Sequence, residues 1–194
     1  MDTTSSPTIR RARPDEAAAL SALALRSKGH WGYDAAFLDT CRADLTLTPA
    51  EIDRDAVYVI AAGSDPPRGF YQVQEAGASH DAGQVQEPGA SHDAGRLRAA
   101  AADLILNALF VEPGTIGRGY GRQLFAHAVA LATARGAHGL IWTSDPYAAG
   151  FYRALGARLV GATPSTIFPD RLLPTFHLAL PAPVDLSPAC SSPH

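Results

Sequence analysis

The sequence predicts an α/β fold with a mixed, twisted central sheet of six or seven strands flanked by about four helices. Short apolar segments rich in β-branched residues alternate along the chain with alanine- and leucine-rich segments of helical spacing. Residues 104–135 join a strand, a glycine-rich turn and a helix in direct succession. A hydrophobic content of 46% and a charged content of 18% suit a globular protein with a substantial core.

The central strand is predicted over residues 104–111, which are apolar apart from Asn107. Pro113 cannot donate a hydrogen bond to a sheet, so the strand is expected to end near Glu112. The helix that follows presents its apolar residues on one face, and Gly136 stands where a helix C-terminal glycine is typical.

The glycine-rich turn predicts an anion site. Gly117, Gly119 and Gly121 allow the backbone to approach a ligand closely. The first-turn N–H groups of the helix lack intrahelical partners, and the helix dipole favours negative charge there. Arg118 and Arg122 add positive charge, so a pyrophosphate is the expected ligand. The alternative is a structural turn that binds nothing.

The glycine spacing argues against two common nucleotide sites. Counted from Gly117, the sixth position of a dinucleotide fingerprint is Arg122 instead of glycine. The Gly-Lys-Ser/Thr sequence of a phosphate-binding loop is missing as well. A nucleotide-binding domain therefore stays the weakest of the alternatives.

Residues 116–121 resemble the core motif of the GNAT (GCN5-related) N-acetyltransferase family, Gln/Arg-x-x-Gly-x-Gly/Ala at a helix start. Ile116 stands where glutamine or arginine is usual, but the binding groups in such folds are mostly backbone amides. The resemblance implies acetyl-CoA as cosubstrate. The implied cofactor-binding residues are Leu109, Phe110, Val111, Ile116, Gly117, Arg118, Gly119, Tyr120, Gly121 and Arg122.

A second motif, residues 145–157, is similar to the family's Asn/Asp-x-x-Ala-x-x-Phe-Tyr-x-x-x-Gly segment. By this resemblance Asp145, Ala148 and Phe151 belong to the cofactor site. Tyr152 takes the position of the general acid, which protonates the departing CoA thiolate. The alternative for Tyr152 is a ring that only packs in a helix.

The resemblance further implies that the strand ending at Val111 and the strand before Asp145 splay apart and hold the pantetheine arm between them. A backbone N–H there would polarise the thioester carbonyl. Many relatives carry a glutamate in the central strand where this chain has Asn107, which cannot act as a base. The sequence leaves Glu112, His30, Asp34 and an ordered water as unranked candidates for the base.

The N-terminal part predicts a strand over residues 8–12, a helix over 15–27, a loop over 28–33 and a second helix over 35–45. Residues 27–33 resemble one bacterial branch of the same family. That resemblance places His30, Trp31 and Tyr33 beside the acceptor site as substrate-binding residues. Packing of these rings onto the core is an equally weighted alternative.

The remaining predicted elements complete the sheet. Residues 57–62 and 70–73 form a hairpin, and a helix over 147–155 is preceded by one strand and followed by two. Those three strands are predicted over residues 138–143, 158–161 and 175–180.

Residues 72–83 are followed at once by the same twelve residues, with Pro88 in place of Ala76. Two units cannot stack into a solenoid, so residues 72–95 are predicted to be a duplicated loop insertion in one domain, residues 1–180. The two His-Asp pairs of this insertion are a minor candidate for a metal site, and a solvated loop is preferred. Residues 181–194 are expected to be a disordered tail.

The overall charge of −3 favours neither nucleic acid nor anionic membranes as a partner. No apolar run is long enough to span a membrane, no secretory signal is recognised, and Cys41 and Cys190 form no disulfide framework. The predicted protein is a cytoplasmic N-acetyltransferase that acts on a small-molecule or peptide amine. A non-catalytic acyl-CoA-binding regulatory module is the alternative, and a homodimer stays open.

Overall fold

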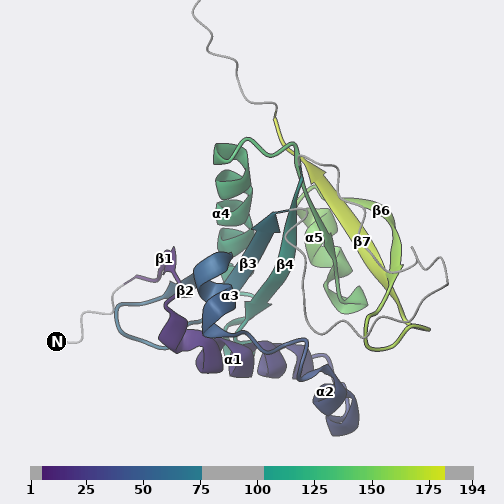
Figure 1. Cartoon of the computed structure of the whole chain (residues 1–194), viewed down its shortest axis with the longest axis horizontal. Coiled ribbons are helices and arrows are strands. Elements are labelled where there is room, and N and C mark those ends of the chain that lie inside the picture. Colours follow the sequence, from purple (N-terminus) through teal and green to yellow (C-terminus); the bar gives the residue numbers. More distant parts are fainter. Residues whose placement is uncertain (1–5, 76–102, 182–194) are drawn as a thin grey trace, which may run out of the picture.

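A computed structural model describes residues 6–75 and 103–181 of the chain (Figure 1). Within these ranges seven strands form one sheet in the order β1-β2-β3-β4-β5-β7-β6. The strands are β1 (Thr8–Arg11), β2 (Ala56–Ala61), β3 (Gly69–Glu75), β4 (Asp103–Val111), β5 (Gly139–Thr143), β6 (Arg158–Pro164) and β7 (Leu172–Ala179). The predicted mixed α/β sheet is therefore confirmed.

The sheet is antiparallel except at its centre, where β4 and β5 run parallel. The register between β3 and β4 shifts between Gln72 and Val73, which pair with Ala108 and Leu106. Asn107 is the extra residue of this β-bulge. A bulge bends its strand and redirects a side chain, which matters for the site described below.

Helices cover both faces of the sheet. Those in the described ranges are α1 (Ala17–Gly29), α2 (Ala35–Cys41), α3 (Pro49–Arg54), α4 (Tyr120–Ala134) and α5 (Ala149–Ala154), with single 3-10 turns at Pro14–Glu16, Pro113–Thr115 and Pro146–Ala148. Leu20, Leu23 and Ile52 of α1 and α3 pack in one buried cluster. Leu124 and Phe125 of α4 pack in the other. Helices α1 and α3 therefore pack on one face of the sheet and α4 on the other (Figure 1).

Several predicted boundaries were wrong for local reasons. The second helix ends at Cys41 instead of residue 45, because the Arg42 N–H bonds to the Asp39 carbonyl three residues back and the chain continues in turns. The first helix continues through Gly29, so the predicted loop over residues 28–33 is shorter. Helix α3 was missed although Thr48 supplies its capping box, because six residues carry too short a periodic pattern.

Strand β7 begins three residues earlier than predicted and contains Pro174. The Pro174 carbonyl accepts a hydrogen bond from the Ser144 N–H at 2.9 Å, just beyond the end of β5 at Thr143. A residue's N–H and carbonyl point to the same side of an antiparallel strand. The N–H that proline lacks would therefore face a position where β5 has already ended, and the strand tolerates it.

Parts of the predicted duplication and tail lie outside the described residues. Residues 72–75 of the first copy are in β3 instead of a loop, whereas the rest of the repeat falls in 76–102. The predicted tail, beyond Pro181, also falls outside. No helix among the described residues is long and apolar enough to cross a membrane.

Candidate active site

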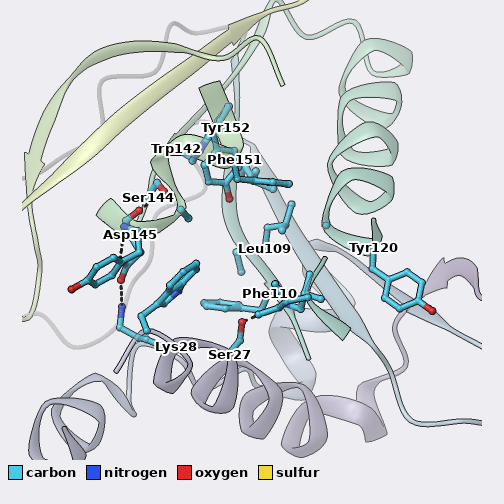
Figure 2. Close-up of a pocket in the computed structure, with 18 of the residues that line it drawn as sticks. Ser27, Lys28, Leu109, Phe110, Tyr120, Trp142, Ser144, Asp145, Phe151 and Tyr152 are labelled. Carbon is cyan, nitrogen blue, oxygen red and sulfur yellow. Dashed lines mark hydrogen bonds and ion pairs between the residues drawn. The ribbon is translucent and has the colours of Figure 1, made fainter. Parts of the chain in front are cut away.

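A cavity of about 490 Å³ opens between β4 and β5, and Figure 2 shows residues that line it. Its walls come from the end of α1, the second half of β4, the start of α4, the end of β5 and the first turns after it. Because α1 and α4 lie on opposite faces, elements from both sides of the sheet contribute to the cavity wall.

The gap between the strands arises because β4 and β5 part early. Among the described residues, only Asp103–Ile105 of β4 pairs with β5, and the rest of β4 has no strand partner on that edge. On the other edge the Glu112 N–H donates to the Arg68 carbonyl at 2.8 Å. Since N–H and carbonyl groups alternate between the two edges, those of Leu109 and Val111 face the cavity. The Val111 N–H lies 3.4 Å from the Ser27 hydroxyl oxygen, which accepts from it.

The glycine turn presents free backbone donors at the other end of the cavity. Gly117 and Gly119 have φ of 85° and 83°, in the left-handed region that favours glycine. The first bond within α4 runs from the Gln123 N–H to the Gly119 carbonyl at 3.0 Å. The N–H groups of Tyr120 to Arg122, in the first turn of α4, therefore point out of the N-terminal end of the helix, where the helix dipole favours an anion.

Side chains of the turn contribute unequally. Figure 2 shows the Tyr120 ring directed away from the other labelled residues, so Tyr120 lines the cavity through its backbone. Ile116 and Arg122 are exposed and line the cavity, whereas Arg118 is exposed but is not part of its wall. A Cβ at Gly121 would lie 3.4 Å from the Phe151 ring, so the space at this position would admit an alanine.

Tyr152 projects from α5 into an aromatic cluster of Phe125, Trp142 and Phe176, and its ring is 6% exposed. Burial raises the pKa of Tyr152, so the hydroxyl keeps its proton at neutral pH. Within residues 6–75 and 103–181 its hydroxyl has no hydrogen-bond partner, and only Trp142 Nε1 is both fully enclosed and unpartnered. The Tyr152 hydroxyl therefore retains exposure, and it faces the cavity that Tyr152 lines.

Asp145, expected in the cofactor site, is the centre of a polar cluster at the end of β5. Its carboxylate accepts hydrogen bonds from the Tyr33 hydroxyl at 2.9 and 3.0 Å and from the Tyr147 N–H at 3.1 Å. Lys28 Nζ and Arg171 Nη2 lie 3.3 and 3.4 Å from it, and Arg171 also donates to the Tyr33 hydroxyl. Burial and the bond to Asp145 raise the pKa of Tyr33 to about 12. The cluster ties α1, β5 and the segment before β7 together around one side of the cavity.

The predicted substrate-binding rings are only partly in the cavity. Trp31 lines it and stacks on Tyr147, with ring centroids 5.6 Å apart and planes at 13°. His30 contacts Trp31 edge-on at 5.3 Å without lining the cavity, and Tyr33 acts through Asp145. The loop therefore does shape a wall of the cavity, and packing explains its other rings.

The candidates for a base are mostly engaged elsewhere. Glu112 forms a bidentate ion pair with Arg26, with N–O distances of 2.7 and 3.1 Å. Asp34 caps α2 by accepting from the Phe37 N–H. No group of three or more His, Cys, Asp or Glu side chains in the described part of the chain could hold a metal ion.

One polar network near the cavity escaped the sequence prediction. Asp55, which is buried, accepts from Gln72 and Gln74, and Gln72 in turn accepts from Asn107 in the cavity wall. The available signal was the pair of glutamines at alternate positions of an otherwise apolar strand. Alternation places them on one face, where buried amides need a partner.

Comparisons with known proteins agree with this architecture. The model of the acetyltransferase (GNAT) family matches residues 50–157, more than half of the chain. None of the curated proteins compared with the chain matches it.

Solved structures of acetyltransferases share the fold at low identity. One is the PaiA N-acetyltransferase of Thermoplasma acidophilum in complex with coenzyme A, with a TM-score of 0.65, 14% identity and coverage of 90% of this chain and 99% of that one. A GCN5-related N-acetyltransferase of Rhodopseudomonas palustris gives a TM-score of 0.63 at 18% identity, covering 93% and 99%. YncA, a putative acetyltransferase of Salmonella typhimurium with its cofactor acetyl-CoA, gives 0.59 at 18% identity, covering 96% and 100%. The parted central strands, the glycine turn at a helix start and the match to the family model together show that this chain belongs to the acetyltransferase (GNAT) family.

Proposed function

We propose that the protein transfers the acetyl group of acetyl-CoA to a primary amine of a small molecule or peptide. Acetyl-CoA is the cosubstrate, and its pyrophosphate binds at the N-terminus of α4 with its pantetheine arm along the free edge of β4. The observation that carries the proposal is the Tyr152 hydroxyl, which has no hydrogen-bond partner among the described residues and lies in a cavity that the peptide groups of Leu109 and Val111 also face.

In the proposed reaction the neutral amine attacks the thioester carbon, forming the C–N bond of a tetrahedral intermediate. A cavity-facing N–H of β4 stabilises the oxyanion. The C–S bond then breaks, and the CoA thiolate takes the proton of the Tyr152 hydroxyl. The proton lost by the amine leaves to water, because the candidate carboxylates Glu112 and Asp34 are held in an ion pair and a helix cap. A proton from water restores the Tyr152 phenol after the products leave.

The alternative is a non-catalytic acyl-CoA-binding regulatory module. Asn107 favours it, because an amide in the central strand cannot accept the proton of an amine. The Tyr152 hydroxyl favours catalysis, because it has no partner among the described residues and a binding module would have no use for such a phenol in the cavity.

A binding measurement followed by a turnover assay tests the proposal. Calorimetric titration of the purified protein with acetyl-CoA is expected to show micromolar binding, with ATP and NAD as negative controls. Thiol release is then followed with butylamine, tyramine, spermidine, L-lysine and an alanine-terminated peptide. Acetyl-CoA binding without thiol release from any amine would favour the regulatory module, and absence of acetyl-CoA binding would contradict both.

A further inference from the structure

Asn107 occupies a special place in the cavity wall. It is the bulged residue of β4, it is exposed, and it lines the cavity. Its hydrogen bond to Gln72 places its side chain on the face of the sheet that α1 covers. Phe70, two residues before Gln72 in β3, packs there with the α1 residues. Tyr152 and the glycine turn approach from the opposite face.

A buried carboxylate stands at the far end of the Asn107 hydrogen bonds. Asp55 is 5% exposed and forms an ion pair with Arg54 at 2.8 Å. It accepts from the side-chain amides of Gln72 at 2.6 Å and Gln74 at 2.7 Å. Burial opposes ionisation, but the hydrogen bonds from Arg54, Gln74 and Gln72 outweigh it and lower the pKa of Asp55. Asp55 is therefore an ionised group at neutral pH that can only accept hydrogen bonds.

The Asp55 carboxylate fixes the orientation of two amides in succession. Gln72 must turn its NH₂ group toward Asp55, which leaves its carbonyl Oε1 facing Asn107. Asn107 must then donate its own NH₂ group to Gln72, and it does so at 3.1 Å. The Asn107 carbonyl Oδ1 is left with its lone pairs free, and no group in the described ranges donates to it. An amide that could otherwise face either way is thus held as a hydrogen-bond acceptor.

From this chain of bonds we infer that Asn107 Oδ1 receives an N–H of the acceptor amine and positions its nitrogen for attack, on the face opposite Tyr152. The inference rests on the proposed function and deepens it. Asn107 orients the amine and takes no proton from the amine. The site therefore selects acceptors whose amine can donate an N–H to Asn107 Oδ1. Gln72 is a positioning residue that acts through Asn107, and Asp55 acts through Gln72.

Two matched variants separate this role from plain stabilisation. Gln72→Met and Gln74→Met each remove one buried hydrogen bond to Asp55 and keep the side-chain length, but only Gln72 contacts Asn107. With butylamine as the probe, Gln72→Met is expected to raise KM for the amine about tenfold, the usual worth of one well-placed hydrogen bond. The Kd of acetyl-CoA should not change. Gln74→Met should leave the amine KM within about twofold of wild type.

A double-mutant cycle and an NMR measurement complete the test. In an Asn107→Ala background, Gln72→Met should have no further effect on the amine KM, since both changes remove the same acceptor. The Asn107 side-chain NH₂ resonance should exchange slowly in wild type and in Gln74→Met but rapidly in Gln72→Met. Equal changes of the amine KM in the two glutamine variants would overturn the inference. An exchange rate of the Asn107 side-chain NH₂ that is the same in Gln72→Met as in wild type would also overturn it. The NMR readout needs no turnover, so failure of all amines in the assay would count against the proposed function alone.

Discussion

Two buried tyrosines with similar surroundings differ in one respect. Tyr152 and Tyr71 are 6% and 0% exposed, both lie among aromatic rings, and burial raises the pKa of each. The Tyr71 hydroxyl shares a 2.7 Å hydrogen bond with His127 Nδ1 and does not line the cavity. The Tyr152 hydroxyl has no partner in the described part of the chain and lines the cavity. We call the surroundings of Tyr71 and His127 the closed region, because the Tyr71 hydroxyl already has a protein partner. We call the surroundings of Tyr152 the open region, because this hydroxyl faces a cavity that a ligand could fill.

Because both phenols have a raised pKa and only one faces the cavity, the pKa of a buried phenol does not identify a catalytic residue. Burial is the largest cause of the raised pKa in both tyrosines, and what separates them is whether the hydroxyl already has a hydrogen-bond partner. A polar group that folding leaves unpaired in a cavity lowers stability unless a ligand completes it. The same reasoning applies to the two ends of α4, because Gly119 starts the helix at the cavity and Gly136 follows its other end.

The largest expected effect concerns the two ends of α4. Gly119 and Gly136 have φ of 83° and 72°, and neither has an atom within 4 Å of a Cβ built on it. Valine at either position should therefore cost a similar stability, about 1–2 kcal/mol of backbone strain. Gly119→Val alone should weaken acetyl-CoA binding, by about 100-fold, because charge-assisted bonds to the pyrophosphate are lost. Calorimetry and thermal melts of both variants measure this, and equal affinities would remove the anion site from the account.

The second effect is on turnover. Tyr152→Phe should lower kcat by about tenfold or more, since the thiolate then leaves without a proton donor. Its Kd for acetyl-CoA and its melting temperature should stay near wild type, because the hydroxyl has no hydrogen-bond partner to lose among the described residues. Tyr71→Phe is the matched control and should keep full kcat. A kcat of Tyr152→Phe equal to that of wild type would reduce Tyr152 to a packed ring.

Much of this account was accessible from sequence. The glycine turn and the motif of residues 145–157 are local patterns, and the structure has them at the start of α4 and after β5. The polar cluster at Asp145 and the hydrogen bonds from Asp55 to Asn107 were not predicted, because their members are far apart in the sequence and are brought together by tertiary packing and by the register between β3 and β4. The bulge that turns Asn107 is likewise a property of strand pairing, which no single segment specifies.

A third, smaller effect is on stability. Tyr71→Phe should lower the free energy of unfolding by about 1 kcal/mol, because His127 loses its partner in a half-buried site. In a chain of this size that corresponds to a fall in Tm of about 2–4 °C, measured by calorimetry or circular dichroism. Tyr152→Phe should show no such fall. A larger fall in Tm for Tyr152→Phe than for Tyr71→Phe would contradict the assignment of Tyr71 to the closed region and of Tyr152 to the open region.

The smallest effect is a pH dependence from the closed region. Burial lowers the pKa of His127 in the folded protein below its ordinary value of about 6.5. The unfolded chain then binds the proton more readily, so the contribution of His127 to stability is present above pH 6.5 and is lost as the pH falls through the lowered value. His127→Gln should flatten the decline of Tm between about pH 7.5 and 5.5. A decline of the same size in both proteins would place the pH sensitivity in other groups.

The most direct test of the open region is a crystal structure of the protein with acetyl-CoA. The pyrophosphate should lie against the backbone N–H groups of Tyr120 to Arg122. The pantetheine arm should lie along the peptide groups of Leu109 and Val111. The thioester sulfur should lie within about 3.5 Å of the Tyr152 hydroxyl, the reach needed for direct proton transfer. Acetyl-CoA bound elsewhere, or in the cavity with its sulfur beyond reach of Tyr152, would contradict the assignment of Tyr152 as general acid.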